Sequence, residues 1–190
     1  EARKFATDPL GMPPGDGPPP PRVVYADEDL VVVDKPGGMP SVPARTPADP
    51  PDVGRLLTPT HGFLEAVHRL DRDTSGLLVL ARSRAARSTL GAAFERGGVA
   101  KRYLAVVRGI LRPARGHVCL PLAGDRDRPP RQRVDVILGR RATTRWRTLA
   151  VAEGDPPLTL LELEPVTGRS HQLRVHLAWL GCPIAGDRLY

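Results

Sequence analysis

The first strongly apolar stretch of the chain is rich in β-branched residues, which favour β-strands. Residues 22–26 and 30–34 are two short runs rich in valine, separated by the acidic residues 27–29. Two β-branched runs that are joined by a short polar turn are typical of a hairpin. Lys35-Pro-Gly-Gly follows, and its proline and glycines end the second strand. We therefore predict a hairpin over residues 22–34.

Helical periodicity appears in two later segments. Ser83 has the position of an N-cap, and apolar residues at helical spacing follow it as far as the glycine pair at 97–98. In residues 170–180, Leu173, Leu177 and Leu180 lie at i, i+4 and i+7, and Gly181 follows. The pattern predicts a helix in each segment.

The remaining apolar runs predict the strands of a sheet. Residues 77–81 form a short continuous run, typical of a strand buried on both faces. The proline-rich residues 40–59 indicate a long loop, with one helical turn at 52–57. Many strands and few helices favour an α+β domain with a mixed or largely antiparallel sheet. The other candidate strands are residues 102–108, 117–120, 133–138, 143–151 and 158–166.

Composition separates a leader from the fold. Residues 9–21 hold seven prolines and three glycines, with almost no apolar side chains to bury. Such a segment cannot form a core, so we expect residues 1–21 to be a disordered leader. Residues 22–190 have the length of one domain.

The net charge of +7 indicates a polyanionic partner. All but three of the 28 basic residues are arginines, whose planar guanidinium suits phosphates. A GC-rich codon bias would explain the same excess, but the electrostatic consequence holds either way and favours a nucleic acid. Two cysteines, no long apolar run and no signal-like start lead us to expect a cytoplasmic protein that does not enter a membrane.

The chemistry-bearing residues concentrate first in a charged turn before residues 77–81. It contains His68, Arg69, Asp71, Arg72 and Asp73. A carboxylate beside arginines stays ionised and can act as a nucleophile or general base. The alternative is a surface turn with local salt bridges.

Two further segments are candidates for a site. Arg169 and Arg174, at the start of the last helix, could bind a phosphate or carboxylate, or could simply point to water. Tyr103 shares one strand face with Ala105 and Val107. It could offer a stacking ring and a weakly acidic hydroxyl, or it could be an ordinary core residue.

Together with the hairpin, these segments resemble the RluA-type pseudouridine synthases. The matching stretches occur in the order that the family has, and the His-Arg-Leu-Asp and Gly-Arg-Ser-His-Gln-Leu-Arg segments are highly specific. They are residues 28–43, 68–81, 101–109, 165–176 and 181–190.

The resemblance implies an enzyme that converts uridine to pseudouridine in RNA without a cofactor or metal. The family breaks the bond between N1 and C1′, rotates the uracil and rejoins it through C5, on a curved sheet flanked by a few helices. Asp71 matches the catalytic aspartate, which requires a base flipped out of its stack. Arg69 matches the side chain that fills the gap, Tyr103 the active-site tyrosine, and Arg174 the residue that pairs with the aspartate.

The resemblance also implies the partners. We expect His68, Arg72, Lys101 and Arg169 to bind RNA, and Thr74 and Gly76 to be structural residues of the catalytic motif. Ribosomal RNA, transfer RNA or both are the expected substrates, and the protein is expected to be a monomer without a protein partner. The chain is most similar to the short branch that has no separate N-terminal RNA-binding domain. Family members continue past residues 186–190 with a final strand, so this chain is expected to lack it.

Three other functions deserve comparison. A zinc site would need an arrangement of cysteines and histidines whose spacing here is poor. A two-metal nuclease using Asp71, Asp73, Asp125 and Asp127 conflicts with the arginines between them. The strongest alternative is a non-catalytic RNA-binding or RNA-chaperone domain on the same fold. RNA binding that survives Asp71→Ala while activity is lost would distinguish the enzyme from it.

Overall fold

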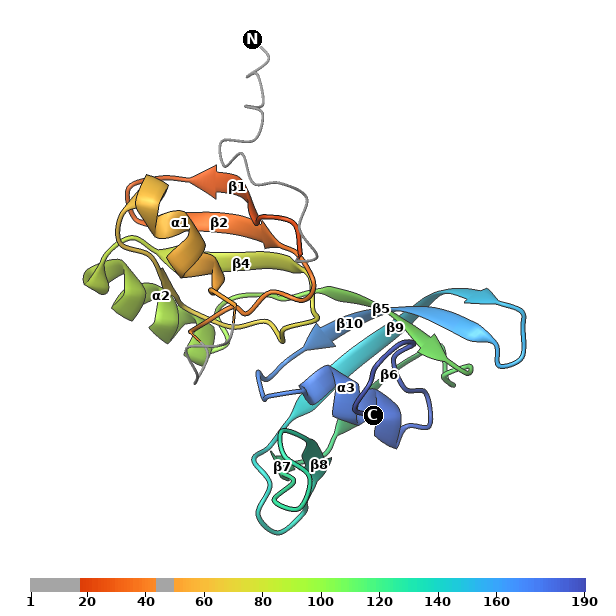
Figure 1. The fold of residues 1–190 in the computed structure, drawn as a ribbon. Helices are drawn as coiled ribbons and strands as arrows, with labels where there is room; N and C mark the ends of the chain where they lie inside the picture. Colours follow the sequence, from red (N-terminus) through yellow and green to blue (C-terminus); the bar gives the residue numbers. More distant parts are fainter. Residues whose placement is uncertain (1–17, 44–49) are drawn as a thin grey trace. The chain divides into compact units, whose positions relative to one another are not determined.

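The structure is a computed structural model that describes residues 18–43 and 50–190 (Figure 1). The chain forms two compact units, residues 1–92 and 93–190. Among the described residues the strands form two four-stranded sheets and one two-stranded sheet, and all their pairings are antiparallel. The predicted α+β class is therefore confirmed. Most of the proposed leader, residues 1–17, lies outside the described residues, as do residues 44–49 of the predicted loop.

The first unit is a sheet with helix α1 and most of helix α2. Its strand order is β1-β2-β4-β3. The predicted hairpin is confirmed, since β1 pairs with β2. The Asp27 carboxylate accepts the amides of Asp29 and Leu30 and so fixes the turn between them. The elements are β1 (Arg22–Ala26), β2 (Leu30–Lys35), α1 (Val53–His61), β3 (Glu65–Ala66), β4 (Gly76–Ala81) and α2 (Arg84–Glu95).

The core of this unit lies between the sheet and α1. Alternate residues of β2 and β4 point to the same face, where they pack against apolar residues of α1. The buried members are Val31, Val33, Met39, Val53, Leu57, Leu78 and Leu80.

Two expectations for this unit need correction. Strand β4 is buried on one face only: Leu77 lies opposite Asp34 on the other face and is 62% exposed. Helix α1 is longer than the single predicted turn. Asp52 caps its start by accepting the amides of Gly54 and Arg55, and the helix continues to His61 because its buried face packs on the sheet.

Helix α2 follows its sequence signals. The Ser83 hydroxyl accepts the amide of Ala86, which is the expected N-cap bond. At the other end Gly97 has φ +74°, a left-handed conformation that favours glycine. Both predicted ends of this helix are confirmed.

The second unit is built on a sheet of order β5-β10-β9-β6, with α3 packed on one face (Figure 1). Residues 182–185 run along the free edge of β5, where Ile184 pairs with Val107. The elements are β5 (Tyr103–Arg108), β6 (Arg115–Cys119), β7 (Leu122–Gly124), β8 (Gln132–Val134), β9 (Thr143–Ala152), β10 (Leu158–Pro165) and α3 (Gln172–Trp179).

The strand predicted over residues 133–138 is wrong for most of its length. Strand β8 ends at Val134, and the Asp135 carboxylate then accepts the amides of Ile137 and Leu138. This turn removes those amides from any strand ladder, and the apolar side chains at 136–138 are exposed. Asp135 is therefore the turn residue that interrupts this apolar run.

Helix α3 begins two residues later than predicted. His171 has φ +52°, so the helix starts only at Gln172, and Gly181 with φ +75° follows its end as expected. Leu177 anchors α3 in a core that includes Val107, Trp146, Leu161 and Leu163. No helix among the described residues is long and apolar enough to cross a membrane.

Candidate active site

The charged turn of the first unit is fixed on both sides of Asp71. The Thr74 amide donates to the Asp71 carbonyl at 3.0 Å and closes the turn. Ahead of it, the buried Ser41 hydroxyl donates to the Leu70 carbonyl at 2.9 Å and accepts the Leu70 amide at 3.1 Å. Both backbone groups of the residue before Asp71 are therefore held by one side chain.

Lys35 holds the other side of the turn from the end of β2. Its side chain is fully buried, and Nζ donates to the carbonyls of Pro36, Met39 and Arg72 at 2.9, 2.8 and 3.0 Å. Burial lowers the pKa of Lys35 to about 8, although the nearby carboxylates of Asp73 and Asp71 act in the opposite direction. The ammonium thus stays charged at neutral pH and joins the residues after β2 to the turn.

The other predicted residues of the turn have different roles. Arg69 is exposed, whereas Arg72 Nε donates to the Gly38 carbonyl at 3.0 Å. His68 Nε2 accepts the Val79 amide at 3.1 Å, so Nδ1 carries the proton of the neutral ring. Gly76 lies opposite Lys35 and has φ +120°, a backbone conformation that residues with a side chain rarely adopt.

Sequence reasoning missed Lys35 and Ser41 as residues of this site. The signal for Lys35 was present, because alternation along β2 puts it on the same buried face as Val31 and Val33. A lysine on a buried strand face needs partners for its charge. For Ser41 the sequence carried no comparable signal, since its partner is 29 residues away.

In the second unit, Tyr103 lies where the strand period placed it. It shares a face of β5 with Ala105 and Val107, is half-buried and packs against the core. Lys101 Nζ lies 3.9 Å from the position that a Cβ on Gly168 would occupy. The structure thus brings Lys101 next to the turn that carries Arg169, whose Nε donates to the Arg141 carbonyl.

Gln172 fixes that turn at the start of α3. Its Oε1 accepts the Arg169 amide at 3.0 Å and the Thr167 hydroxyl at 2.8 Å. Its Nε2 donates to the carbonyl of Thr143 and to the Thr144 hydroxyl, both on β9. The amide of Arg169 therefore already has an acceptor, and an anion bound here would depend on the arginine side chains.

His176 is a structural residue of the same network. Its Nε2 is 3.0 Å from the Leu120 carbonyl, which can only accept, so Nε2 carries the proton and Nδ1 accepts from the Thr144 hydroxyl. Burial lowers the pKa of His176 below its ordinary value, which favours this neutral ring. Among the described residues no group of three or more His, Cys, Asp or Glu side chains could hold a metal ion.

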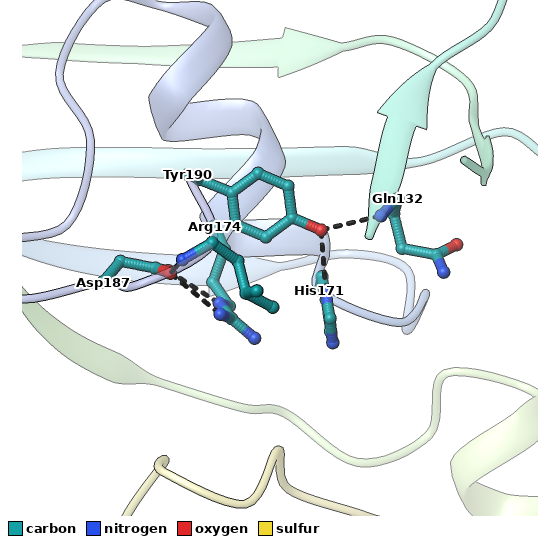
Figure 2. Close-up of polar contacts among 6 residues, drawn as sticks. Gln132, His171, Arg174, Asp187 and Tyr190 are labelled. Atoms are coloured by element: carbon teal, nitrogen blue, oxygen red, sulfur yellow. Dashed lines mark hydrogen bonds and ion pairs between the residues drawn. The ribbon is translucent and has the colours of Figure 1, made fainter. Parts of the chain in front are cut away.

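Arg174 forms a bidentate pair with Asp187 (Figure 2). Nε and Nη2 donate to the two carboxylate oxygens at 2.7 and 2.8 Å, and the Asp187 side chain is only 5% exposed. Burial alone would raise the pKa of Asp187, but hydrogen bonds from Arg174 and the Leu189 amide outweigh it and hold the pKa low. The sequence-based prediction named Arg174 but missed Asp187.

The predicted catalytic residues are divided between the two units. Asp71 belongs to the first unit, and Tyr103 and Arg174 belong to the second. The pairing of Arg174 with Asp71 that the resemblance implies stays a prediction.

The sequence of the chain is similar to those of known proteins. Residues 29–179 match the family described as RNA pseudouridylate synthase. The chain is 43% identical to the dual-specificity RNA pseudouridine synthase RluA of Haemophilus influenzae over 168 residues, 88% of this chain and 76% of that protein. The chain is 40% identical to the dual-specificity RNA pseudouridine synthase RluA of Escherichia coli K12, again over 88% of this chain and 76% of that protein.

Solved structures agree with this match. Human RNA pseudouridylate synthase domain containing 1 superposes with a TM-score of 0.75 at 28% identity, covering 93% of this chain and 71% of that one. Human RNA pseudouridylate synthase domain containing 4 superposes with a TM-score of 0.71 at 30% identity, covering 89% of this chain and 68% of that one. The family match covers most of the chain, and the turn around Asp71 and the fold agree with it. The chain therefore belongs to the RNA pseudouridylate synthase family.

Proposed function

We propose that this enzyme isomerises specific uridines in ribosomal RNA, transfer RNA or both, with Asp71 as its catalytic carboxylate. The RluA relatives are named dual-specificity RNA pseudouridine synthases, which supports structured RNA of both kinds as substrate. The protein would act in the cytoplasm as a monomer. Its net charge of +7 supports binding to the RNA backbone.

The fixed turn around Asp71 is the observation that carries this proposal. Ser41 holds both backbone groups of Leu70, and Lys35 holds the carbonyl of Arg72, so the backbone on each side of Asp71 is restrained. A surface turn needs no such restraint. A carboxylate that must reach one atom of a flipped nucleotide does, because small displacements of a catalytic group cost rate.

The other residues have supporting roles in this proposal. Arg69 is exposed and next to the restrained backbone, and would fill the gap left by the flipped nucleotide. Tyr103 would pack on the uracil, and Arg174 would keep the catalytic carboxylate ionised and oriented. His68, Arg72, Lys101 and Arg169 would contact RNA.

Pseudouridine mapping in cells lacking the protein tests this proposal. Ribosomal and transfer RNA from these cells is compared with RNA from cells that again produce the wild type, Asp71→Asn or Asp73→Asn. We expect particular pseudouridines to disappear, and the wild type and Asp73→Asn to restore them. Asp73→Asn is a matched control because it removes the same charge two residues away.

A binding experiment completes the test. Purified Asp71→Asn should bind the identified RNA with wild-type affinity but convert it at least about 10⁴-fold more slowly, as expected when a reaction loses its essential carboxylate. If Asp71→Asn restores the pseudouridines, the assignment of Asp71 is wrong. If no position changes in the deleted cells, the protein is a non-catalytic RNA-binding domain.

A further inference from the structure

The second unit contains a set of contacts around Arg174 that the proposed function leaves unexplained. We call it the Arg174 cluster; its members are Gln132, His171, Arg174, Asp187 and Tyr190 (Figure 2). They come from β8, from α3 with the residue before it, and from the segment after Ile184, which pairs with β5. Asp187 and Tyr190 contact the guanidinium itself, and Gln132 and His171 hold the hydroxyl of Tyr190.

The first contact is the bidentate pair with Asp187. An arginine has five N–H groups, and Asp187 takes one from Nε and one from Nη2. The carboxylate is itself fixed, because its Oδ1 also accepts the Leu189 amide at 2.9 Å. Two parallel bonds to a fixed carboxylate set the plane of the guanidinium, so its other three N–H groups point in defined directions.

The second contact is the ring of Tyr190. The Arg174 Cζ lies 5.1 Å from the ring centroid, within the range of a cation–π contact. The ring is held in turn through its hydroxyl, which is 2.7 Å from the Gln132 amide and 2.7 Å from His171 Nδ1. The backbone amide can only donate, so the hydroxyl accepts it and can give its own proton to His171.

These contacts restrain the Arg174 side chain far more than a surface arginine requires. A buried carboxylate that pairs with an arginine offsets its positive charge and so weakens its attraction for phosphates. A restrained arginine is useful where its direction matters, as it does when it must orient another carboxylate.

We propose that Asp187 and Tyr190 are positioning residues of the isomerase, acting through Arg174 by fixing the direction of its remaining N–H groups. This inference rests on the proposed function of Arg174 as the residue that orients the catalytic carboxylate. It predicts that the cluster controls the rate of conversion and has little effect on the affinity for RNA.

The test measures single-turnover conversion and RNA affinity on the substrate stem-loop identified by the mapping experiment. Asp187→Asn should lower the single-turnover rate about 100-fold, as a misplaced catalytic group does, and change the Kd for RNA less than about threefold. Asp187→Glu keeps the charge and should restore part of the rate. Equal losses in rate and affinity, or an unchanged rate, would overturn the inference.

Asp125→Asn is the matched control for folding. The Asp125 side chain is also 5% exposed, also accepts an arginine Nε and also accepts a backbone amide, but it lies outside the Arg174 cluster. We expect Asp125→Asn to lose thermal stability to a similar degree and to keep the wild-type rate. A similar loss of rate in both variants would mean that Asp187 is only a structural residue.

A double mutant separates this inference from the proposed function. In an Arg174→Ala background, adding Asp187→Asn should slow the reaction no further, because Asp187 acts through Arg174. Guanidinium chloride at non-denaturing concentration should speed up Arg174→Ala but not the double variant. If Arg174→Ala keeps the wild-type rate, the proposed role of Arg174 is wrong; if the losses add, only the inference about Asp187 is wrong.

Tyr190 gives a graded series. Tyr190→Phe keeps the ring and loses the bonds of the hydroxyl to Gln132 and His171, whereas Tyr190→Leu removes the ring as well. The rates should fall in the order wild type, Tyr190→Phe, Tyr190→Leu, at nearly constant RNA affinity. A reversed order, or a loss that appears only in affinity, would contradict the positioning role.

Discussion

At the scale of single residues, the most informative side chain is one whose charge the fold buries. Lys35 is fully buried and gives its three donors to the backbone, one of them to the turn that carries Asp71. A buried ammonium is costly unless each of its protons finds an acceptor, and the three carbonyls supply this. The cost that remains appears as a pKa lowered to about 8.

This pKa predicts a dependence of stability on pH. The unfolded chain keeps its lysine protonated up to about pH 10.5, whereas the folded chain releases the proton near pH 8. Between these values the unfolded state binds more protons, so the contribution of Lys35 to the unfolding free energy should become more favourable as pH rises from 8 to 10.5.

Urea unfolding at several pH values, compared between the wild type and Lys35→Met, measures this contribution. Lys35→Met should be less stable by about 2–4 kcal/mol at pH 7, because three buried carbonyls lose their donor. The difference between the two proteins should grow from pH 8 to 10. A difference that stays constant with pH would show that Lys35 keeps its ordinary pKa.

At the scale of elements, α3 is tied to β9 by polar groups as well as by apolar packing. Gln172 bonds two residues of β9 and two positions of the turn before α3, and His176 adds the Leu120 carbonyl. Each donor in this network has an acceptor, so removing one member leaves several buried groups unsatisfied. The network places the turn with Arg169 and the first residues of α3, including Arg174.

Gln172→Ala tests this network. We expect a loss of about 2–4 kcal/mol in the unfolding free energy, because the amide of Arg169 and the hydroxyls of Thr144 and Thr167 lose partners. Gln132→Ala is the control, since within the described residues the side chain of Gln132 donates a single long bond, of 3.3 Å, to the neighbouring Arg131 carbonyl. Equal losses by urea denaturation would mean that the network adds nothing beyond the packing of α3.

At the scale of the whole molecule, charge dominates the expected interaction with RNA. The net charge of +7 comes mainly from arginines, and several of them pair with carboxylates of the chain itself. Exposed pairs of this kind contribute little to stability. The surplus of positive charge should instead release counterions from RNA on binding, which makes the affinity depend on salt.

The slope of log Kd against log salt measures how many phosphates are contacted. About five phosphate contacts would give a slope of magnitude near 4. Arg169→Gln should lower this magnitude by about 1 if Arg169 contacts a phosphate. Arg22→Gln, at a position with an ion-pair partner in β1–β2, should leave the slope unchanged. A slope near zero in the wild type would contradict binding through the backbone.

The sequence by itself determined the elements whose signals are local. The hairpin of β1 and β2, the ends of α2 and the shared face of Tyr103, Ala105 and Val107 follow from turn residues, caps and strand period, which act within a few residues. The family could also be recognised, because its motifs are continuous stretches that match residues 29–179.

Only the tertiary structure decided how these motifs are supported. The bonds of Ser41 to Leu70, of Lys35 to Arg72 and of Arg174 to Asp187 span 29, 37 and 13 residues. No local pattern encodes such partners, since a side chain finds them only when the chain folds back on itself. The strand predicted at 133–138 was wrong for a related reason: its apolar run favoured a strand, but the Asp135 carboxylate accepts the amides of Ile137 and Leu138.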